Sequence, residues 1–204
     1  MKNSVWLANF ENEVNALKGK RKSNNKLVLI MVPVMFAIFG IIGLINGAKL
    51  TSVLPIFGLG AFMLLFVLLI CKKNDKKDDA KGVRDNLASL LRSDDEVDEF
   101  DNQMAAPIGR LRVGLNNQII FTKDYLGSAF AFGGMPDYRF ARYSDIRGIK
   151  YVKTKSSTKI GEITYLVDFL NIQGKNIFGT TIDGSAAMGE FQAALKQFAP
   201  HINM

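Results

Sequence analysis

The chain has 204 residues, of which 48% are hydrophobic, and its net charge is +7. This length allows one or two domains. With one cysteine and one histidine, the chain can form neither an internal disulfide bond nor a zinc site built from cysteine and histidine ligands.

Residues 1–26 are predicted to form an amphipathic helix followed by a basic linker. Apolar residues recur at helical spacing, and Gly19 is expected to end the helix. Two roles for this apolar stripe stay open. In the first, it lies on an anionic membrane surface, as helices rich in aromatic and basic residues do. In the second, it packs on the chain's own cytoplasmic domain. The predicted anchor at the membrane surface consists of Trp6, Phe10, Lys20, Arg21 and Lys22.

Residues 27–71 are predicted to form a transmembrane hairpin, with helices at 27–45 and 50–71. Neither stretch contains a charged residue. A helix rises about 1.5 Å per residue, so each stretch can cross a hydrocarbon core roughly 30 Å thick. Buried core helices of a soluble protein rarely run this long without a polar residue. Small residues such as Gly40 and Gly58 are expected to let the two helices approach closely.

The basic residues around the hairpin predict its orientation. Lysines and arginines precede the first span and follow the second, whereas the connecting segment "NGAKL" contains only Lys49. Basic residues near span ends are retained on the cytoplasmic side. The sequence therefore predicts a multi-pass protein of the cell's inner (cytoplasmic) membrane, with both termini in the cytoplasm.

Residues 72–106 are predicted to form a charged linker and two short helices. Ser93 and Glu96 have the spacing of a capping box at the start of the second helix. Several acidic residues follow, from Asp94 to Asp101, but the glycine that an EF-hand calcium loop requires is absent. Acidic side chains are favourable near a helix N-terminus, so this cluster is interpreted as a solvated helix face.

Residues 107–204 are predicted to form about seven strands and one C-terminal helix. Asn-Asn at 116–117 and Gln-Gly at 173–174 indicate hairpin turns. Ser185 is expected to cap the final helix, and Pro200 to follow its end. An antiparallel sheet of this size needs two packed layers or a barrel to bury its apolar side chains. The predicted fold class is thus an α+β membrane protein with a sheet or partial barrel capped by the last helix.

The segment "YSDIRGIKY", residues 143–151, is predicted to be a turn that leads into a buried strand. Ser144 and Asp145 favour the turn, while Ile146 and Ile149 enter the core. Together with the order of the neighbouring strands and the final helix, this segment resembles bacterial PH-like domains of the GRAM/PH superfamily. The resemblance covers residues 107–200 and implies a PH-like fold. A pair of transmembrane helices also fits that family.

No motif in the sequence indicates catalysis. Phosphate-binding loops are absent, and His201 lies near the C-terminus. No catalytic residue, metal or cofactor is therefore predicted. The near balance of acidic and basic residues after the second span argues against nucleic acid as a partner. Basic residues along one strand could bind anionic headgroups or a partner, or form a solvated face of the sheet: Arg147, Lys150, Lys153 and Lys155.

The leading functional hypothesis is a non-enzymatic, membrane-tethered binding or scaffold module. Its PH-like domain would dock a protein partner or anionic lipid at the inner leaflet, in contact with membrane lipids, and association into a homo-oligomer stays open. One alternative is an accessory subunit of a larger membrane assembly such as a transporter. Another is an enzyme whose site has no recognisable motif.

Overall fold

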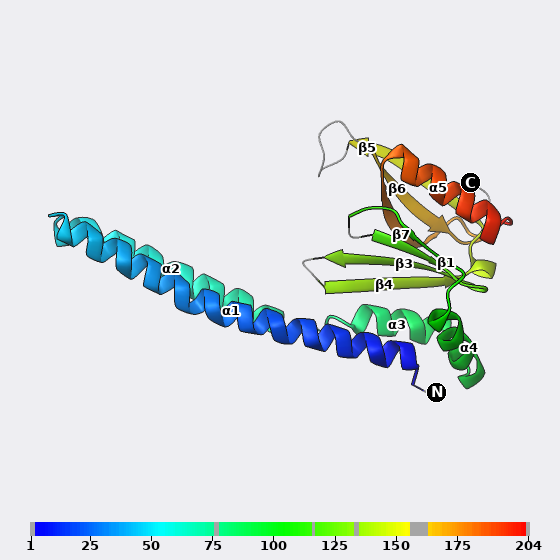
Figure 1. Ribbon diagram of the computed structural model, residues 1–204, viewed down its shortest axis with the longest axis horizontal. Coiled ribbons are helices and arrows are strands. Elements are labelled where there is room, and N and C mark those ends of the chain that lie inside the picture. The colour runs from blue at the N-terminus through cyan, green and yellow to red at the C-terminus, as the bar shows by residue number, and fades with distance from the viewer. Residues whose placement is uncertain (1–2, 76–77, 116, 133–134, 156–162, 203–204) are drawn as a thin grey trace. The chain divides into compact units, whose positions relative to one another are not determined.

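The computed structural model describes residues 3–75, 78–115, 117–132, 135–155 and 163–202 (Figure 1). Two units make up the chain: Asn15–Asp78, and Met1–Val14 together with Asp79–Met204. The described residues contain five α-helices and two antiparallel sheets. This confirms the predicted α+β class.

The first unit consists of two long apolar helices. Helix α1 covers Val5–Ile45, and its first residues belong to the other unit; α2 covers Leu50–Asp75. Gly47, at φ 85°, lies in the turn between them, where a left-handed conformation favours glycine. Both helices are long and apolar enough to cross a membrane, and most of their apolar side chains are exposed. A core helix of a soluble protein would bury them.

The two helices pack through reciprocal contacts between phenylalanine and glycine. Phe57 of α2 lies against Gly40 of α1, and Phe36 of α1 lies against Gly60 of α2. A methyl group at either glycine would collide with the opposing ring, whereas Gly58 faces open space. The prediction of close packing at Gly40 is confirmed, but Gly60 takes the place expected for Gly58.

Helix α1 does not end at Gly19, as the sequence had suggested. It continues without a break through the basic segment into the apolar stretch. One glycine inside a helix costs only about 1 kcal/mol relative to alanine, and lysine and arginine are good helix formers. With helix on both sides of this segment, the cost of nucleating a new helix does not arise.

The second unit contains the seven predicted strands, but they form two sheets. Strands β1 to β4 form the first sheet in chain order, and β5 to β7 form the second. The first has the strands Gly109–Arg112, Asn117–Phe121, Tyr125–Phe132 and Met135–Arg142. The second has Gly148–Lys155, Ile163–Leu170 and Asn176–Asp183.

A short 3₁₀ turn, Tyr143–Asp145, separates the two sheets between β4 and β5. After this turn Ile146 is fully buried, so the chain enters the core and leaves the first sheet. Near the C-terminal ends of β1 and β7, the sheets are joined by a backbone hydrogen bond from the Asp183 N–H to the Val113 carbonyl at 2.7 Å. The segment 143–151 is therefore a structural turn followed by a strand, as predicted, but the strand is not buried. Ile149 packs against the core, whereas Tyr151 and Val152 are exposed, because the core covers only one face of this strand, near its start.

Three shorter helices complete this unit: α3 at Lys81–Leu90, α4 at Asp94–Ala105 and α5 at Ser185–Phe198. The capping of α4 is confirmed, because the Ser93 hydroxyl accepts a hydrogen bond from the Glu96 N–H at 3.2 Å. The predicted cap of α5 is wrong. Gly184 occupies that position at φ 87°, and the Ser185 hydroxyl contacts the Tyr165 hydroxyl at 3.1 Å instead.

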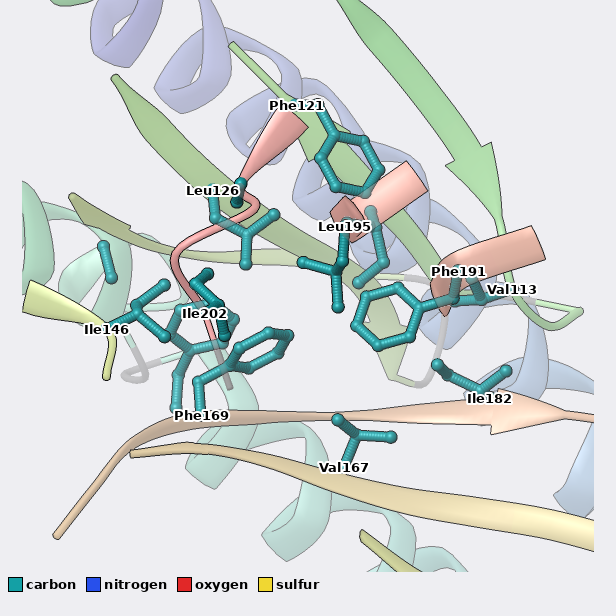
Figure 2. Close-up of a cluster of buried hydrophobic side chains, with 14 of the residues drawn as sticks. Val113, Phe121, Leu126, Ile146, Val167, Phe169, Ile182, Phe191, Leu195 and Ile202 are labelled. Atoms are coloured by element: carbon teal, nitrogen blue, oxygen red, sulfur yellow. The ribbon is translucent and has the colours of Figure 1, made fainter. Parts of the chain in front are cut away.

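One hydrophobic core lies between the two sheets and α5 (Figure 2). Phe191 and Leu195 of α5 are fully buried there, and Phe191 contacts Phe169 of β6 in an edge-to-face arrangement at 6.1 Å. The apolar stripe predicted for the final helix is thus the face that closes this core. The helix ends before Pro200, in agreement with the sequence.

A second core covers the opposite face of the four-stranded sheet. The first turns of α1 pack there with α3 and α4. Trp6 stacks on Phe10 at 5.7 Å and contacts Phe140 of β4 and Phe100 of α4 edge to face at 5.1 and 5.8 Å. Phe10 is buried. Two roles were predicted for this stripe, and the structure shows the second one: the stripe packs on the chain's own domain. A buried aromatic side chain cannot also enter a lipid surface.

Candidate functional site: the β5 surface

The predicted basic residues lie on or next to β5, and all four are exposed. They do not form one patch. Successive side chains of a strand point to opposite faces, so Lys153 and Lys155 share a face with Tyr151, whereas Lys150 lies on the other. Lys153 Nζ lies 5.8 Å from the centre of the Tyr165 ring, whose side chain belongs to the core. Arg147 precedes the strand.

Within the residues that the structure describes, the second sheet is covered on one face only. Its inner face packs in the core through residues such as Val167 and Phe169. On its outer face, Val152 of β5 lies directly opposite Leu166 of β6, and these side chains are 50% and 46% exposed. Lys150 and Asp168 are the next opposing pair on that face. The outer face is thus a small apolar area with charged neighbours.

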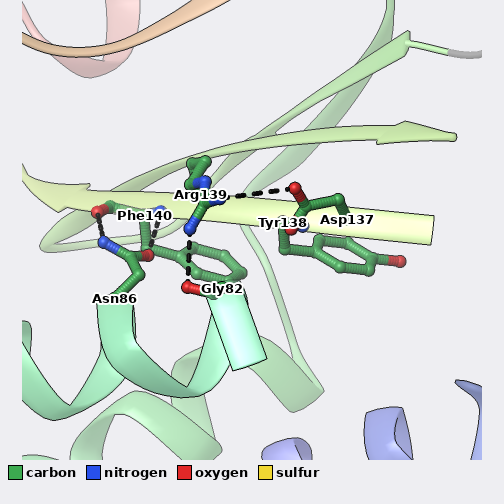
Figure 3. A network of polar contacts seen from close by, with 6 residues as sticks. All are labelled: Gly82, Asn86, Asp137, Tyr138, Arg139 and Phe140. Atoms are coloured by element: carbon green, nitrogen blue, oxygen red, sulfur yellow. Dashed lines mark hydrogen bonds and ion pairs between the residues drawn. The ribbon is translucent and has the colours of Figure 1, made fainter. Parts of the chain in front are cut away.

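The free edge of β4 is closed by helix α3 (Figure 3). The Asn86 side chain donates to the Phe140 carbonyl at 3.1 Å and accepts from the Phe140 N–H at 2.8 Å, as a neighbouring strand would. Arg139 reaches from the same strand to the Gly82 carbonyl at 2.6 Å. An edge covered in this way cannot pair with another chain.

The edge of β7 is occupied at its C-terminal end. The Asn117 side chain donates to the Thr181 carbonyl at 2.9 Å, near the Asp183–Val113 bond that joins the sheets. Within the described parts of the chain, β5 pairs with β6 alone and has no backbone partner on its other side. We call the outer face of β5 and β6, together with this free edge, the β5 surface. Its residues on the outer face are Lys150, Val152 and Leu166, and those beside the edge are Tyr151, Lys153 and Lys155.

The acidic residues of α4 stabilise the fold. Asp101 caps α1 from a distance in sequence, because its carboxylate accepts from the Ser4 hydroxyl and the Val5 N–H, both at 2.6 Å. Glu96 accepts from the Arg92 N–H and forms an ion pair with Arg142, each at 2.6 Å. These two contacts, the backbone N–H first, lower the pKa of Glu96. Across the described ranges, no group of acidic, histidine and cysteine side chains could hold a metal ion.

The only histidine also has a structural contact. Its Nε2 atom lies 2.9 Å from the Tyr143 carbonyl, to which the ring can donate a hydrogen bond. Burial raises the pKa of Tyr143 well above its usual value of 10. His201 and Tyr143 border an open polar depression of about 500 Å³, whose other charged residues include Glu99, Lys123 and Arg142. Arg142 is already paired with Glu96, so this arrangement indicates no nucleophile and base pair.

Sequence reasoning found the basic residues of β5 but missed what surrounds them. Nothing in the pattern shows that Asn86 covers β4, or that Asp101 caps α1, because both contacts join segments distant in sequence. Lys20, Arg21 and Lys22 are exposed on α1, and their contact with headgroups stays a prediction.

Searches of protein-family models, curated proteins and solved structures found no match to this chain.

Proposed function

We propose that this chain is a non-enzymatic docking module anchored in the membrane by α1 and α2, and that a protein partner binds its β5 surface. The observation that supports the proposal is the difference between the two sheets. In the described residues, the first sheet is covered on both faces and along β4, and only the four-residue β1 keeps an unpaired edge, whereas the second exposes one whole face and the eight-residue edge of β5. Val152 and Leu166 form an exposed apolar pair bordered by Lys150 and Asp168, and an apolar centre with a polar rim is the arrangement of contact surfaces.

A protein partner fits this surface better than a lipid leaflet does. Lys150 lies on one face of β5 and Lys153 and Lys155 on the other, so a flat headgroup layer cannot contact all of them at once. A protein can contact the outer face and also reach the exposed Lys153 and Lys155 side chains around the free edge. We therefore propose protein docking, with the PH-like fold and the inner-leaflet location retained as parts of the proposal. Confinement to a membrane raises the effective concentration toward a membrane-bound partner, so a weak contact suffices.

For the orientation, we expect both termini in the cytoplasm. In a Cys71→Ser background, Lys49→Cys should react with a membrane-impermeant thiol reagent in intact cells, since Lys49 lies in the turn between the helices. Glu190→Cys, at an exposed position of α5, should react only after the cells are opened. The opposite labelling pattern would reverse the topology.

The docking function predicts a specific cross-linking result. A photoreactive phenylalanine analogue at Leu166, on the outer face, should cross-link the full chain to one protein in native membranes. The same group at Glu190 in α5 should not. A second change on the outer face, Val152→Asp, should abolish the product from Leu166.

Other outcomes separate the alternatives. Cross-linking from Leu166 to lipid alone would replace the protein partner by the leaflet. A stoichiometric membrane protein that copurifies even with Val152→Asp would favour an accessory subunit bound through the helices. Equal products from Leu166 and Glu190 would exclude the β5 surface as a specific site.

A further inference from the structure

We propose that the partner contributes an extended, acidic segment that adds to the free edge of β5 as a fourth strand of the second sheet. This inference rests on the proposed function and specifies the partner's chemistry at that site. It starts from the contrast among the sheet edges. Asn86 closes β4, and the Asp183–Val113 bond joins the sheets at β7. In the described part of the chain, β1 and β5 each pair on one side only, but β1 has four residues and β5 has eight, so β5 offers the longer open edge of the two.

The register shows which backbone groups face the open edge. Gly184 N–H donates to the Ile163 carbonyl at 2.8 Å, so Ile163 and every second residue of β6 direct their backbone groups toward β7. Leu166 therefore directs its groups toward β5, where it lies opposite Val152. In β5 it follows that Val152 bonds to β6, whereas Tyr151 and Lys153 direct their N–H and carbonyl groups outward.

An exposed row of backbone donors and acceptors is the site that strand addition uses. Main-chain hydrogen bonds provide the affinity, and the alternating side chains provide the specificity. Tyr151 is 42% exposed beside this edge and offers an amphipathic ring to an incoming segment.

The charges beside the edge select the occupant. The side chains of an added strand alternate between the faces, so acidic residues two positions apart can lie next to Lys153 and Lys155. A second copy of β5 is a poor occupant, because its lysines would face the same lysines across the new pair. Lysines on an edge strand also protect a protein against aggregation, and that role requires no ligand at all.

The test uses the full chain in lipid nanodiscs and a display library of random ten-residue peptides. Selected peptides should be rich in acidic and β-branched residues, and their binding should weaken with salt. Tyr151→Pro should bind the best peptide about tenfold or more weakly than Tyr151→Ala, since proline removes the outward N–H and its ring blocks the approach of a strand. Tyr151→Ala is the matched control, because it loses the same side chain and keeps the amide.

A second variant protects the test against a folding defect in Tyr151→Pro. Lys153→Glu combined with Lys155→Glu changes only exposed side chains and should abolish binding of the acidic peptide. Equal binding by the proline and alanine variants, or selected peptides without an acidic excess, would overturn the inference. Failure of every peptide to bind would also overturn it. In that case, the double variant Lys153→Val with Lys155→Val should be tested for self-association. If it associates, the lysines protect the edge from pairing.

The inference and the proposed function can fail separately. If Tyr151→Pro still gives the protein cross-link from Leu166, the docking module stands and strand addition is wrong. If neither the cross-link nor peptide binding occurs, both are wrong.

Discussion

Phe191→Ala should destabilise the folded unit by about 3–5 kcal/mol, the usual cost of removing a buried phenylalanine. Phe191 is fully buried and closes the core between the two sheets, against Phe169. Many domains are stable by only 5–15 kcal/mol, so the variant should unfold at a much lower urea concentration. The midpoint can be followed through Trp6, the only tryptophan, which lies in the folded unit.

The control is Glu190→Ala, at the adjacent exposed position of the same helix. It should change the midpoint little, because surface substitutions usually stay within about 0.5 kcal/mol. If the two variants unfold at the same urea concentration, α5 does not close the core as described.

Elements with a strong local pattern could be predicted from the sequence. The apolar stretches gave the two long helices, and Gln-Gly at 173–174 separated β6 from β7. Of the other predicted turn, Asn116 lies outside the described residues, and Asn117 is the first residue of β2. Ser93 was recognised as a cap because its partner, Glu96, lies three residues away. Each of these features depends on residues close together in the chain.

Features that depend on distant residues could not be predicted. Alternation along β5 was visible in the sequence, but the four basic residues were grouped by their proximity along the strand and not by face. The division into two sheets follows from the turn at Tyr143–Asp145 and from the packing of Ile146. The alternation within one strand does not show which other strands it will pair with. The openness of the β5 edge depends on which other edges are covered, and Asn86 lies 54 residues from its partner Phe140.

The N-terminal segment shows how one amphipathic stripe can suit two surroundings. Aromatic residues next to "KGKRK" are typical of a helix at a membrane surface, and equally of a helix that covers a sheet. Here the sheet has a matching aromatic face, with Phe140 and Tyr138 within 5.1 Å of the Trp6 ring centre. The Asp101 carboxylate then fixes the start of α1 on that face.

Trp6→Ala should therefore destabilise the folded unit by about 3 kcal/mol, near the lower end for a buried tryptophan because its ring is only partly buried. Val5→Ala, at an exposed position one residue earlier, is the matched control and should have little effect. Hydrogen exchange measured by mass spectrometry can compare the two, with faster exchange expected in α3, α4 and β4 of the tryptophan variant alone. In the unaltered chain, brominated lipids should leave Trp6 fluorescence unquenched. Strong quenching of Trp6, together with unchanged exchange in Trp6→Ala, would show that this segment lies on the membrane surface and does not pack on the sheet.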